Sequence, residues 1–308
     1  KVRFNVGIIA VGSIAIDSIK TPKGEREDLL GGSLSHFSTA ASFYSDVKLL
    51  SVVGKDFPNE YWDYLSEKSI ILGVMVDFKE KTFRWKGYYT DDFGDVVTVS
   101  TELNAFKKFV PQIPSVYKKA KKDVLFLANI DPKLQKTILD EFSYLPLKVL
   151  DTMEYWIQNS RKELEELFPL VDGIIINEKE AFLLTNEKNL FCAVEKLKSY
   201  NFRFIIVKKG ASGVSFFMNE NVINLPAFPV RDVVDPTGAG DSFAGAFLSY
   251  LDHYGVKNLT IKKIKRALAY AVVVSSFVVE DFGVSGLASK TFNDIKKRCK
   301  EYREMIAF

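Results

Sequence analysis

Short apolar runs alternate with amphipathic segments along most of the chain. The runs end at glycine or a polar residue, as buried strands do, and the segments between them repeat apolar residues with helical spacing. The predicted strands are residues 6–11, 49–53, 124–127, 149–150, 173–176 and 204–207. The predicted helices are residues 59–68, 132–142, 160–168, 179–184 and 190–199. This alternation predicts an α/β fold in which helices cover both faces of a mostly parallel sheet.

Two segments interrupt this alternation, and we expect them to form a small β-sheet lid. Residues 14–32 are polar and extended, and they end at a Gly-Gly pair. Residues 82–101 are aromatic and β-branched around an acidic turn at 91–95, which predicts a hairpin. Such a lid could cover a site, or pair through its edge with a second copy in a homodimer. Three lid side chains could face a ligand, although an ordinary amphipathic sheet explains them equally well: Arg84, Trp85 and Tyr88.

The last third of the chain predicts a hairpin and then helices. Residues 214–218 and 222–225 flank an Asn-Glu-Asn turn, and apolar helical stretches follow at 242–250, 261–279 and 291–305. The length of 308 residues by itself allows one large or two modest domains.

Composition excludes several classes of protein. The 308 residues are 47% hydrophobic, and 42 basic and 39 acidic residues give a net charge of +3, so no nucleic-acid partner is expected. The longest apolar stretch, residues 267–279, is too short to cross a bilayer, so no membrane partner is expected. Cys192 and Cys299 stand alone, which fits a cytoplasmic location, and each is expected to be at least half-buried.

The most informative segment is Asp235-Pro236-Thr237-Gly238-Ala239-Gly240-Asp241-Ser242-Phe243, just before an apolar helix. A helix N-terminus presents unpaired N–H groups and positive partial charge, and glycine lets a phosphate approach that backbone. The amides of Gly238, Ala239 and Gly240 could therefore form an anion hole, with Asp241 as general base beside it. The structural alternative is that Asp241 only caps the helix.

This segment closely resembles the C-terminal signature of the ribokinase-like (PfkB) family of carbohydrate and nucleoside kinases. The resemblance implies that residues 1–308 form one three-layer α/β domain, with the β-sheet lid segments at about 14–32 and 82–101 inserted. It also implies ATP and Mg²⁺ as cofactors, and a small-molecule sugar or nucleoside as acceptor. It extends to the N-terminal third, where Gly31-Gly32 and the following helix resemble the part of the family that lines the acceptor site. There His36 stands where relatives often have Asn, and Asp17 matches an aspartate that binds acceptor hydroxyls.

The resemblance also assigns residues at the ends of later strands. Asn129 is a candidate acceptor contact or a simple turn residue, and Asp151 follows the next strand in the same way. Asn177 and Glu180 match a motif that contacts phosphate and holds Mg²⁺ through water, although Asn-x-x-Glu alone is usually a helix start. The remaining candidates lie in the nucleotide-binding turn and in a monovalent-cation site that would bind K⁺: Lys208, Gly210 and Gly213, and Asp235 and Thr237.

Together these motifs predict ATP-dependent phosphoryl transfer to a hydroxyl of a sugar or nucleoside. The chain has no P-loop, so its phosphate site is of another type. Two alternatives stay open: a sugar-phosphate kinase of the same fold, and a non-catalytic regulator that binds a sugar or nucleoside.

Overall fold

A nine-stranded sheet forms the centre of the computed structural model, which describes all residues except 1–6, 91–92, 95, 120, 122 and 308. The strand order is β13-β12-β11-β10-β9-β8-β1-β4-β5, and only the pairs that involve β12 are antiparallel. The strands are β1 (Gly7–Val11), β4 (Asp46–Gly54), β5 (Ile70–Asp77), β8 (Val124–Leu127), β9 (Leu147–Asp151), β10 (Gly173–Asn177), β11 (Phe204–Lys208), β12 (Val214–Met218) and β13 (Asn221–Leu225). The predicted mostly parallel sheet is therefore confirmed; Val6, in the first predicted strand, lies outside the described residues.

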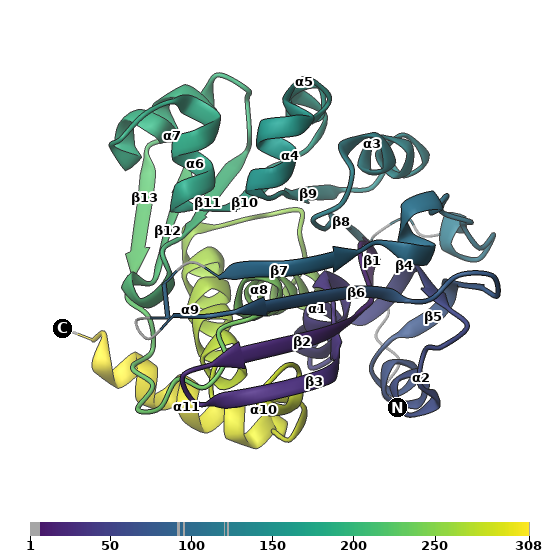
Figure 1. Cartoon of the computed structure of the whole chain (residues 1–308). Coiled ribbons are helices and arrows are strands. Elements are labelled where there is room, and N and C mark those ends of the chain that lie inside the picture. The colour runs from purple at the N-terminus through teal and green to yellow at the C-terminus, as the bar shows by residue number, and fades with distance from the viewer. Residues whose placement is uncertain (1–6, 91–92, 95, 120, 122, 308) are drawn as a thin grey trace.

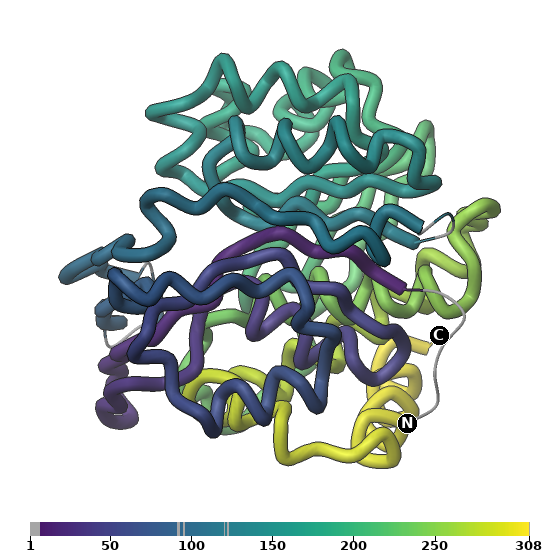
Figure 2. The backbone as a smooth tube through the Cα atoms, turned by 90° about the vertical axis from the view of Figure 1, so that its right-hand side faces the viewer, coloured from purple at the N-terminus to yellow at the C-terminus, as the bar shows by residue number. Residues whose placement is uncertain are grey.

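Helices cover both faces of this sheet, so the fold has three layers (Figures 1 and 2). One face carries α3 (Pro132–Glu141), α4 (Glu154–Asn159), α5 (Arg161–Glu165), α6 (Glu178–Thr185) and α7 (Leu190–Lys198). The other carries α1 (Ser33–Ala41), α2 (Asn59–Lys68), α8 (Ala239–Tyr254), α9 (Ile261–Val278), α10 (Ser285–Ala288) and α11 (Phe292–Met305). Neighbouring residues of β1 point to opposite faces, so that Ile8 joins one buried apolar cluster and Ile9 joins the other.

Three details of the main domain differ from the sequence prediction. The predicted helix 160–168 is shorter, because α5 ends at Glu165 and a 3₁₀ turn at Phe168–Leu170 contains Pro169. Strand β5 was missed although its sequence, Ile-Ile-Leu-Gly-Val-Met-Val-Asp, is almost continuously apolar; as an edge strand it is only partly buried. The prediction that both cysteines are at least half-buried is wrong for Cys192, which is exposed on α7.

The two predicted lid segments form one four-stranded sheet, in the order β3-β2-β6-β7 (front of Figure 1). Its strands are β2 (Ala15–Thr21), β3 (Gly24–Gly31), β6 (Phe83–Tyr88) and β7 (Val97–Glu102). β6 and β7 pair antiparallel as the predicted hairpin, and β2 and β6 pair parallel. Part of the predicted acidic turn lies outside the described residues.

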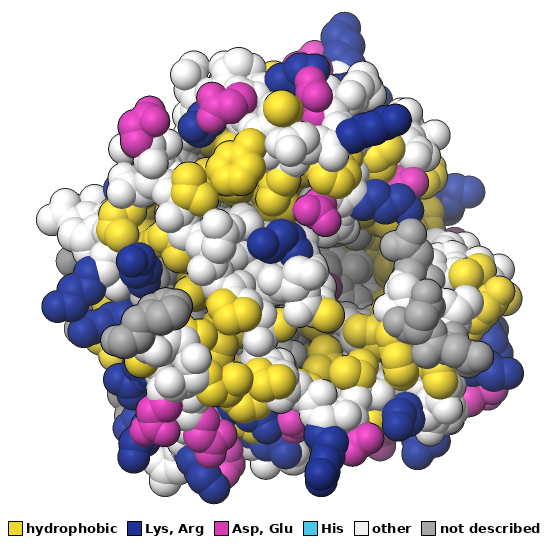
Figure 3. Space-filling model, turned by 90° about the vertical axis from the view of Figure 1, so that its left-hand side faces the viewer, with side chains coloured by type: hydrophobic (Ala, Val, Ile, Leu, Met, Phe, Trp, Pro, Cys, Tyr) yellow, Lys and Arg dark blue, Asp and Glu magenta, His cyan; other side chains and the backbone are white. Residues whose placement is uncertain are grey.

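The strand directions collect the loops that carry the candidate residues. Six neighbouring strands, β11 to β4 in the sheet order, run parallel, so the residues after their carboxyl ends share one edge of the sheet, where ligands bind in open α/β folds. On the face shown in Figure 3, basic and acidic side chains are interspersed rather than gathered into one basic surface. Within the described residues, no helix has the length and apolar character that a membrane crossing requires.

Candidate active site

The loop before α8 is held by Asp235, which is fully buried. Its Oδ1 accepts the N–H of Thr237 at 2.9 Å, and its Oδ2 accepts the N–H of Gly283 at 3.0 Å. Burial raises the pKa of Asp235, while these N–H groups oppose the rise. Asp235 therefore fixes the shape of the loop that leads into the first turn of α8.

Gly238 caps α8 in the left-handed conformation, with φ +74°. A Cβ at this position would overlap the imidazole ring of His36, so only glycine fits both the backbone angle and the space. His36 lies on α1, whose contact with α8 brings the acceptor-side and phosphate-side motifs together. The geometry thus explains why these two residues, distant in sequence, form one site.

Part of the predicted anion hole is free and part is occupied. The N–H of Ala239 donates to the carbonyl of Pro236 at 3.2 Å, so in this conformation it has a partner. Among the described residues, no backbone hydrogen bond involves the N–H groups of Gly238 or Gly240. The N–H groups of Gly238 and Gly240 are thus available to an anion, whereas the N–H of Ala239 would first have to leave the carbonyl of Pro236. The anion hole stays a prediction.

Asp241 lies in the first turn of α8, where it is a helix residue rather than the cap. Burial raises the pKa of its carboxyl from 3.8 to about 7, and the nearby charges of Asp151 and Asp17 add to the rise, while Lys208 opposes it. A carboxyl that titrates near neutral pH can take a proton from a hydroxyl and release it again, which is the requirement for a general base.

A mixed-charge cluster surrounds Asp241 at the ends of β9, β10 and β11. The Lys208 Nζ lies 3.7 Å from the Asp151 Oδ2, and both side chains are largely buried. Burial raises the pKa of Glu180 to about 7, an effect that Lys208 opposes and Asp151 reinforces. Three carboxylates thus share one ammonium, which leaves the cluster acidic.

Asn177 and Glu180 form a capping box at the start of α6, so the structural alternative for this motif is present. The Asn177 Oδ1 accepts the N–H of Glu180 at 2.8 Å, and the Glu180 Oε2 accepts the N–H of Asn177 at 2.7 Å. The cap holds the Glu180 carboxyl at the carboxyl end of β10, next to the acidic cluster. Oxygen donors in an acidic setting fit Mg²⁺, which is held by few carboxylates and keeps several waters.

Asp17 and the Gly31-Gly32 pair form a second acidic pocket at the base of the lid. The N–H of Gly32 donates to the Asp17 Oδ2 at 3.3 Å, and a Cβ on Gly31 would overlap the Asp17 carboxyl. Burial raises the pKa of Asp17 to about 7; the Gly32 N–H opposes this, and Asp235 adds to it. The charge of Asp17 also raises the pKa of Asp241, so the two carboxyls are electrostatic neighbours.

Several buried polar atoms near these strand ends have no partner among the described residues. They are Nδ1 and Nε2 of His36, Oδ1 of Asn129 and Oγ1 of Thr152. Burial lowers the pKa of His36 to about 4, so its ring is neutral at pH 7, with one donor and one acceptor nitrogen. The Asn129 Nδ2 lies 3.1 Å from the Met153 sulfur, a weak acceptor. Unsatisfied buried donors and acceptors are unusual, and a ligand rich in hydroxyl groups would satisfy them.

The predicted nucleotide-binding turn contains two glycines, one with open space beside it and one packed against neighbouring backbone. Gly210 has φ +53°, and a Cβ there would meet no atom within 4 Å, so this backbone is open to a ligand. Gly213 has φ +92° and packs against the backbone around Leu225 and Pro226, which fully accounts for it as a hairpin residue.

The three lid side chains that were candidates from the sequence contact other residues of the lid and the loop beside it, or are exposed. Arg84 pairs with Asp28 and Asp56, the Trp85 Nε1 donates to the Thr98 Oγ1 at 3.3 Å, and Tyr88 is exposed. The ordinary amphipathic sheet therefore accounts for all three.

The lid residue that reaches the site is instead Tyr89, whose hydroxyl lies 3.1 Å from that of Thr237. No pattern in the sequence pointed to Tyr89, because this residue lies just past the end of β6 and meets Thr237 only through the tertiary fold.

Comparison with known proteins places the whole chain among carbohydrate and nucleoside kinases. A family model described as pfkB family carbohydrate kinase matches residues 17–291. The cytidine kinase of Thermococcus kodakarensis is 28% identical over 249 residues, which cover 79% of this chain and 87% of that protein. The nucleoside kinase of Methanothermobacter thermautotrophicus is 25% identical over 307 residues, 94% of each. A ribokinase of Lactococcus lactis is 37% identical, but over 145 residues, 46% of this chain and 43% of that protein.

Solved structures share the fold at lower identity. The nucleoside kinase of Methanocaldococcus jannaschii superposes with a TM-score of 0.76 at 22% identity, covering 97% of this chain and 99% of that one. A Burkholderia thailandensis nucleoside kinase in complex with inosine gives 0.77 at 18%, with coverage of 96% and 98%. A putative ribokinase II from E. coli in complex with ATP and Mg²⁺ gives 0.77 at 19%, with coverage of 96% and 99%.

Proposed function

The chain belongs to the pfkB family of carbohydrate kinases, and on this basis we propose that it transfers the γ-phosphate of ATP to a hydroxyl group of a nucleoside. The observation that carries the proposal is the position of Asp241, whose carboxyl has a pKa near 7 and stands beside the free amides of Gly238 and Gly240. A base and an anion hole at one helix terminus are what hydroxyl-to-phosphoryl chemistry requires.

In the proposed mechanism, the ionised Asp241 takes the proton of the acceptor hydroxyl as its oxygen attacks the γ-phosphorus. The amides of Gly238 and Gly240 then stabilise the charge that develops on the transferring group. Mg²⁺, when bound, would neutralise part of the triphosphate charge, and Glu180 would hold it through water. Asn177 would contact a phosphate, and Gly210 would let the nucleotide approach the backbone.

Asp17 and the neutral His36 would bind acceptor hydroxyls, with Gly31 and Gly32 shaping the pocket and Asn129 as a further contact. A nucleoside is favoured over a free sugar because the relatives that span most of this chain include a cytidine kinase and two nucleoside kinases. In sequence, the ribokinases of Lactococcus lactis and Staphylococcus aureus and a bifunctional ribokinase align with at most 46% of this chain.

An assay of ADP release with a panel of nucleosides, pentoses, hexoses and sugar phosphates tests the acceptor. We expect a nucleoside to give the highest kcat/KM. A higher kcat/KM with a sugar phosphate would instead show that the chain is a sugar-phosphate kinase. Thermal stabilisation by nucleosides without turnover in any reaction would instead identify a non-catalytic binding protein.

Two further predictions concern ions and assembly. We propose that K⁺ binds at Asp235 and Thr237, where it would share carboxylate oxygens that already accept N–H groups. Activity should then be higher in K⁺ salts than in choline salts, and equal activity in both would rule this site out. The lid edge strand β7 is exposed along its length, and Val99 is 58% exposed, which favours pairing with a second copy. Sedimentation of the wild type and of Val99→Lys tests this homodimer.

A further inference from the structure

The ammonium of Lys208 lies beneath the predicted anion hole. Its Nζ is 3.0 Å from the position that a Cβ on Gly240 would occupy, so it touches the first turn of α8. Lys208 ends β11, and its side chain is only 19% exposed. Within the described part of the chain, its Nζ makes no hydrogen bond, and its one ion pair, with Asp151, is a loose 3.7 Å. The ammonium donors are therefore largely unused.

The surroundings keep this ammonium charged. Burial alone would lower the pKa of Lys208, but the charges of Asp151, Glu180 and Asp241 more than offset it and raise the pKa above 10.5. A charged, largely buried donor without a close partner is costly unless an anion completes its hydrogen bonds.

We propose that Lys208 is a catalytic residue whose ammonium binds an oxygen of the transferring phosphoryl group beside Gly240, and that Asp151 is its positioning residue. The proposal rests on the proposed kinase function. No bond to Lys208 forms or breaks, and the ammonium keeps its proton throughout. Lys208 would thereby add a full positive charge to the partial charges of the amides, where negative charge develops.

The simpler alternative is that Lys208 only neutralises the buried Asp151. The variants Lys208→Met, Asp151→Asn and the double variant separate the two roles, because the double variant restores a neutral pair and with it the stability of the fold. If Lys208 binds the phosphoryl group, kcat of the double variant remains about a hundredfold or more below that of the wild type. Loss of a donor that stabilises an oxyanion has an effect of this size. Recovery of wild-type kcat in the double variant would overturn the proposal.

Nucleotide binding gives a second readout that does not depend on turnover. We expect calorimetry to show that Lys208→Met weakens binding of the β,γ-imido analogue of ATP at least tenfold, and changes ADP binding less than threefold. Equal changes for both nucleotides would contradict contact with the γ-phosphoryl group. Lys148→Met is the matched control, because Lys148 forms a half-buried ion pair with Asp172 at the opposite end of β9. If no acceptor is phosphorylated but the contrast between nucleotides persists, the proposed function fails and the γ-phosphate contact stands.

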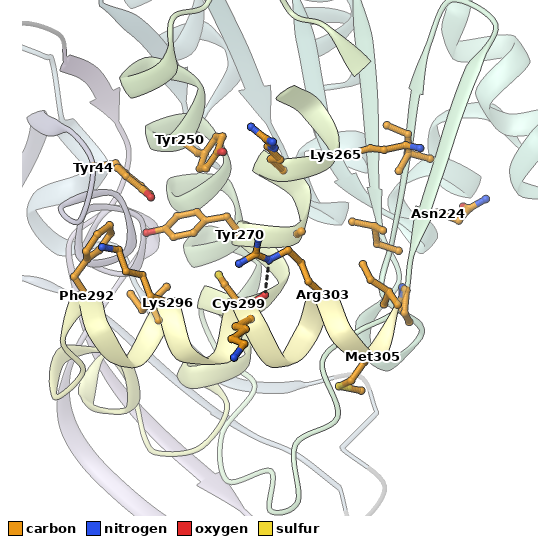
Figure 4. Close-up of a pocket in the computed structure, with 18 of the residues that line it drawn as sticks. Tyr44, Asn224, Tyr250, Lys265, Tyr270, Phe292, Lys296, Cys299, Arg303 and Met305 are labelled. Atoms are coloured by element: carbon orange, nitrogen blue, oxygen red, sulfur yellow. Dashed lines mark hydrogen bonds between the residues drawn. The ribbon is translucent and has the colours of Figure 1, made fainter. Parts of the chain in front are cut away.

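An independent observation concerns a cavity of about 1180 Å³ between α11, α9 and β13 (Figure 4). It lies toward the far end of α8 from Asp241, and Tyr44, Tyr250, Tyr270 and Phe292 form its aromatic wall. Its described lining contains no acidic residue and five basic ones: Lys265, Arg266, Lys296, Lys300 and Arg303. The Tyr270 hydroxyl is buried here without a partner in the described part of the chain.

We infer that this cavity binds a planar aromatic ligand with an anionic group, such as a nucleoside monophosphate. The ring would pack on the tyrosines, and the anion would pair with Lys265 and Arg266, which make no ion pair among the described residues. The ligand would also form a hydrogen bond with the Tyr270 hydroxyl, which is buried and otherwise lacks a partner among the described residues.

The test titrates AMP into the chain saturated with both the β,γ-imido analogue of ATP and the best nucleoside acceptor, so that the nucleotide and acceptor halves of the catalytic site are filled. We expect one AMP per wild-type chain and at least tenfold weaker binding by the Lys265→Ala/Arg266→Ala variant. Tyr270→Phe should weaken binding severalfold and leave kcat without AMP unchanged. Absence of binding at millimolar AMP, or equal binding by wild type and variants, would overturn this second proposal.

Discussion

The hydroxyl oxygens of Tyr89 and Thr237 lie 3.1 Å apart, so the lid touches the loop that leads into α8. The backbone of Tyr89 is fixed as well, because its N–H donates to the carbonyl of Lys20 on β2 at 2.9 Å. Burial raises the pKa of Tyr89 to about 12, so the phenol stays protonated and can donate. Lid position and loop shape are therefore linked by one hydrogen bond.

Tyr89→Phe should weaken this link while keeping the ring. Loss of one hydrogen bond costs about 0.5–1.5 kcal/mol, so we expect acceptor kcat/KM to fall by roughly two- to tenfold. Steady-state kinetics with the best acceptor measure this, with Tyr88→Phe as control, because Tyr88 is the exposed neighbour. Equal kinetics for Tyr89→Phe and wild type would show that the contact does not help acceptor binding or catalysis.

Gly238→Ala should impair both stability and activity. Alanine is strained at φ +74°, by about 1–2 kcal/mol, and its Cβ would also displace the His36 ring. Gly255→Ala is the matched control, because Gly255 has φ +86° but open space around it. We expect both variants to lower Tm and only Gly238→Ala to abolish most turnover. Similar turnover in the two would argue against the packing of His36 on Gly238 as a functional requirement.

The buried carboxyls should make stability depend on pH. Asp17 and Asp241 have pKa values of about 7 in the folded state against an ordinary 3.8, so between these values the folded chain holds protons that the unfolded chain releases. The free energy of unfolding therefore falls as pH rises through this window. We expect Asp17→Asn to raise Tm relative to wild type more at pH 8 than at pH 4.

Asp294 supplies a control of opposite sign for the pH experiment. Bonds from Thr291 hold the pKa of this exposed capping carboxyl below 3.8, so its contribution is present at neutral pH and is lost as pH falls. Asp294→Asn should lower Tm at pH 8. A Tm difference between Asp17→Asn and wild type that is the same at both pH values would contradict the buried-charge account.

Local signals in the sequence were sufficient for much of the fold. Apolar runs such as residues 204–207 predicted β11, and the apolar stretch after the Gly-Asp string predicted α8, although from residue 242 rather than from Ala239, because these features depend on neighbouring residues. The contact of His36 with Gly238 and the pair of Lys208 with Asp151 depend instead on which strands and helices become neighbours. No local pattern carries that information, and so Asp151 had no assigned role from sequence and Tyr89 was missed.

The central claim is that Asp241 is the general base, and phosphoryl transfer by Asp241→Asn tests it most directly. We predict that this variant binds the β,γ-imido analogue of ATP normally and loses about a hundred- to ten-thousandfold in kcat. In the wild type, kcat should rise with pH through about 7, as Asp241 loses its proton. Phosphoryl transfer by Asp241→Asn at a rate near that of the wild type would contradict the account.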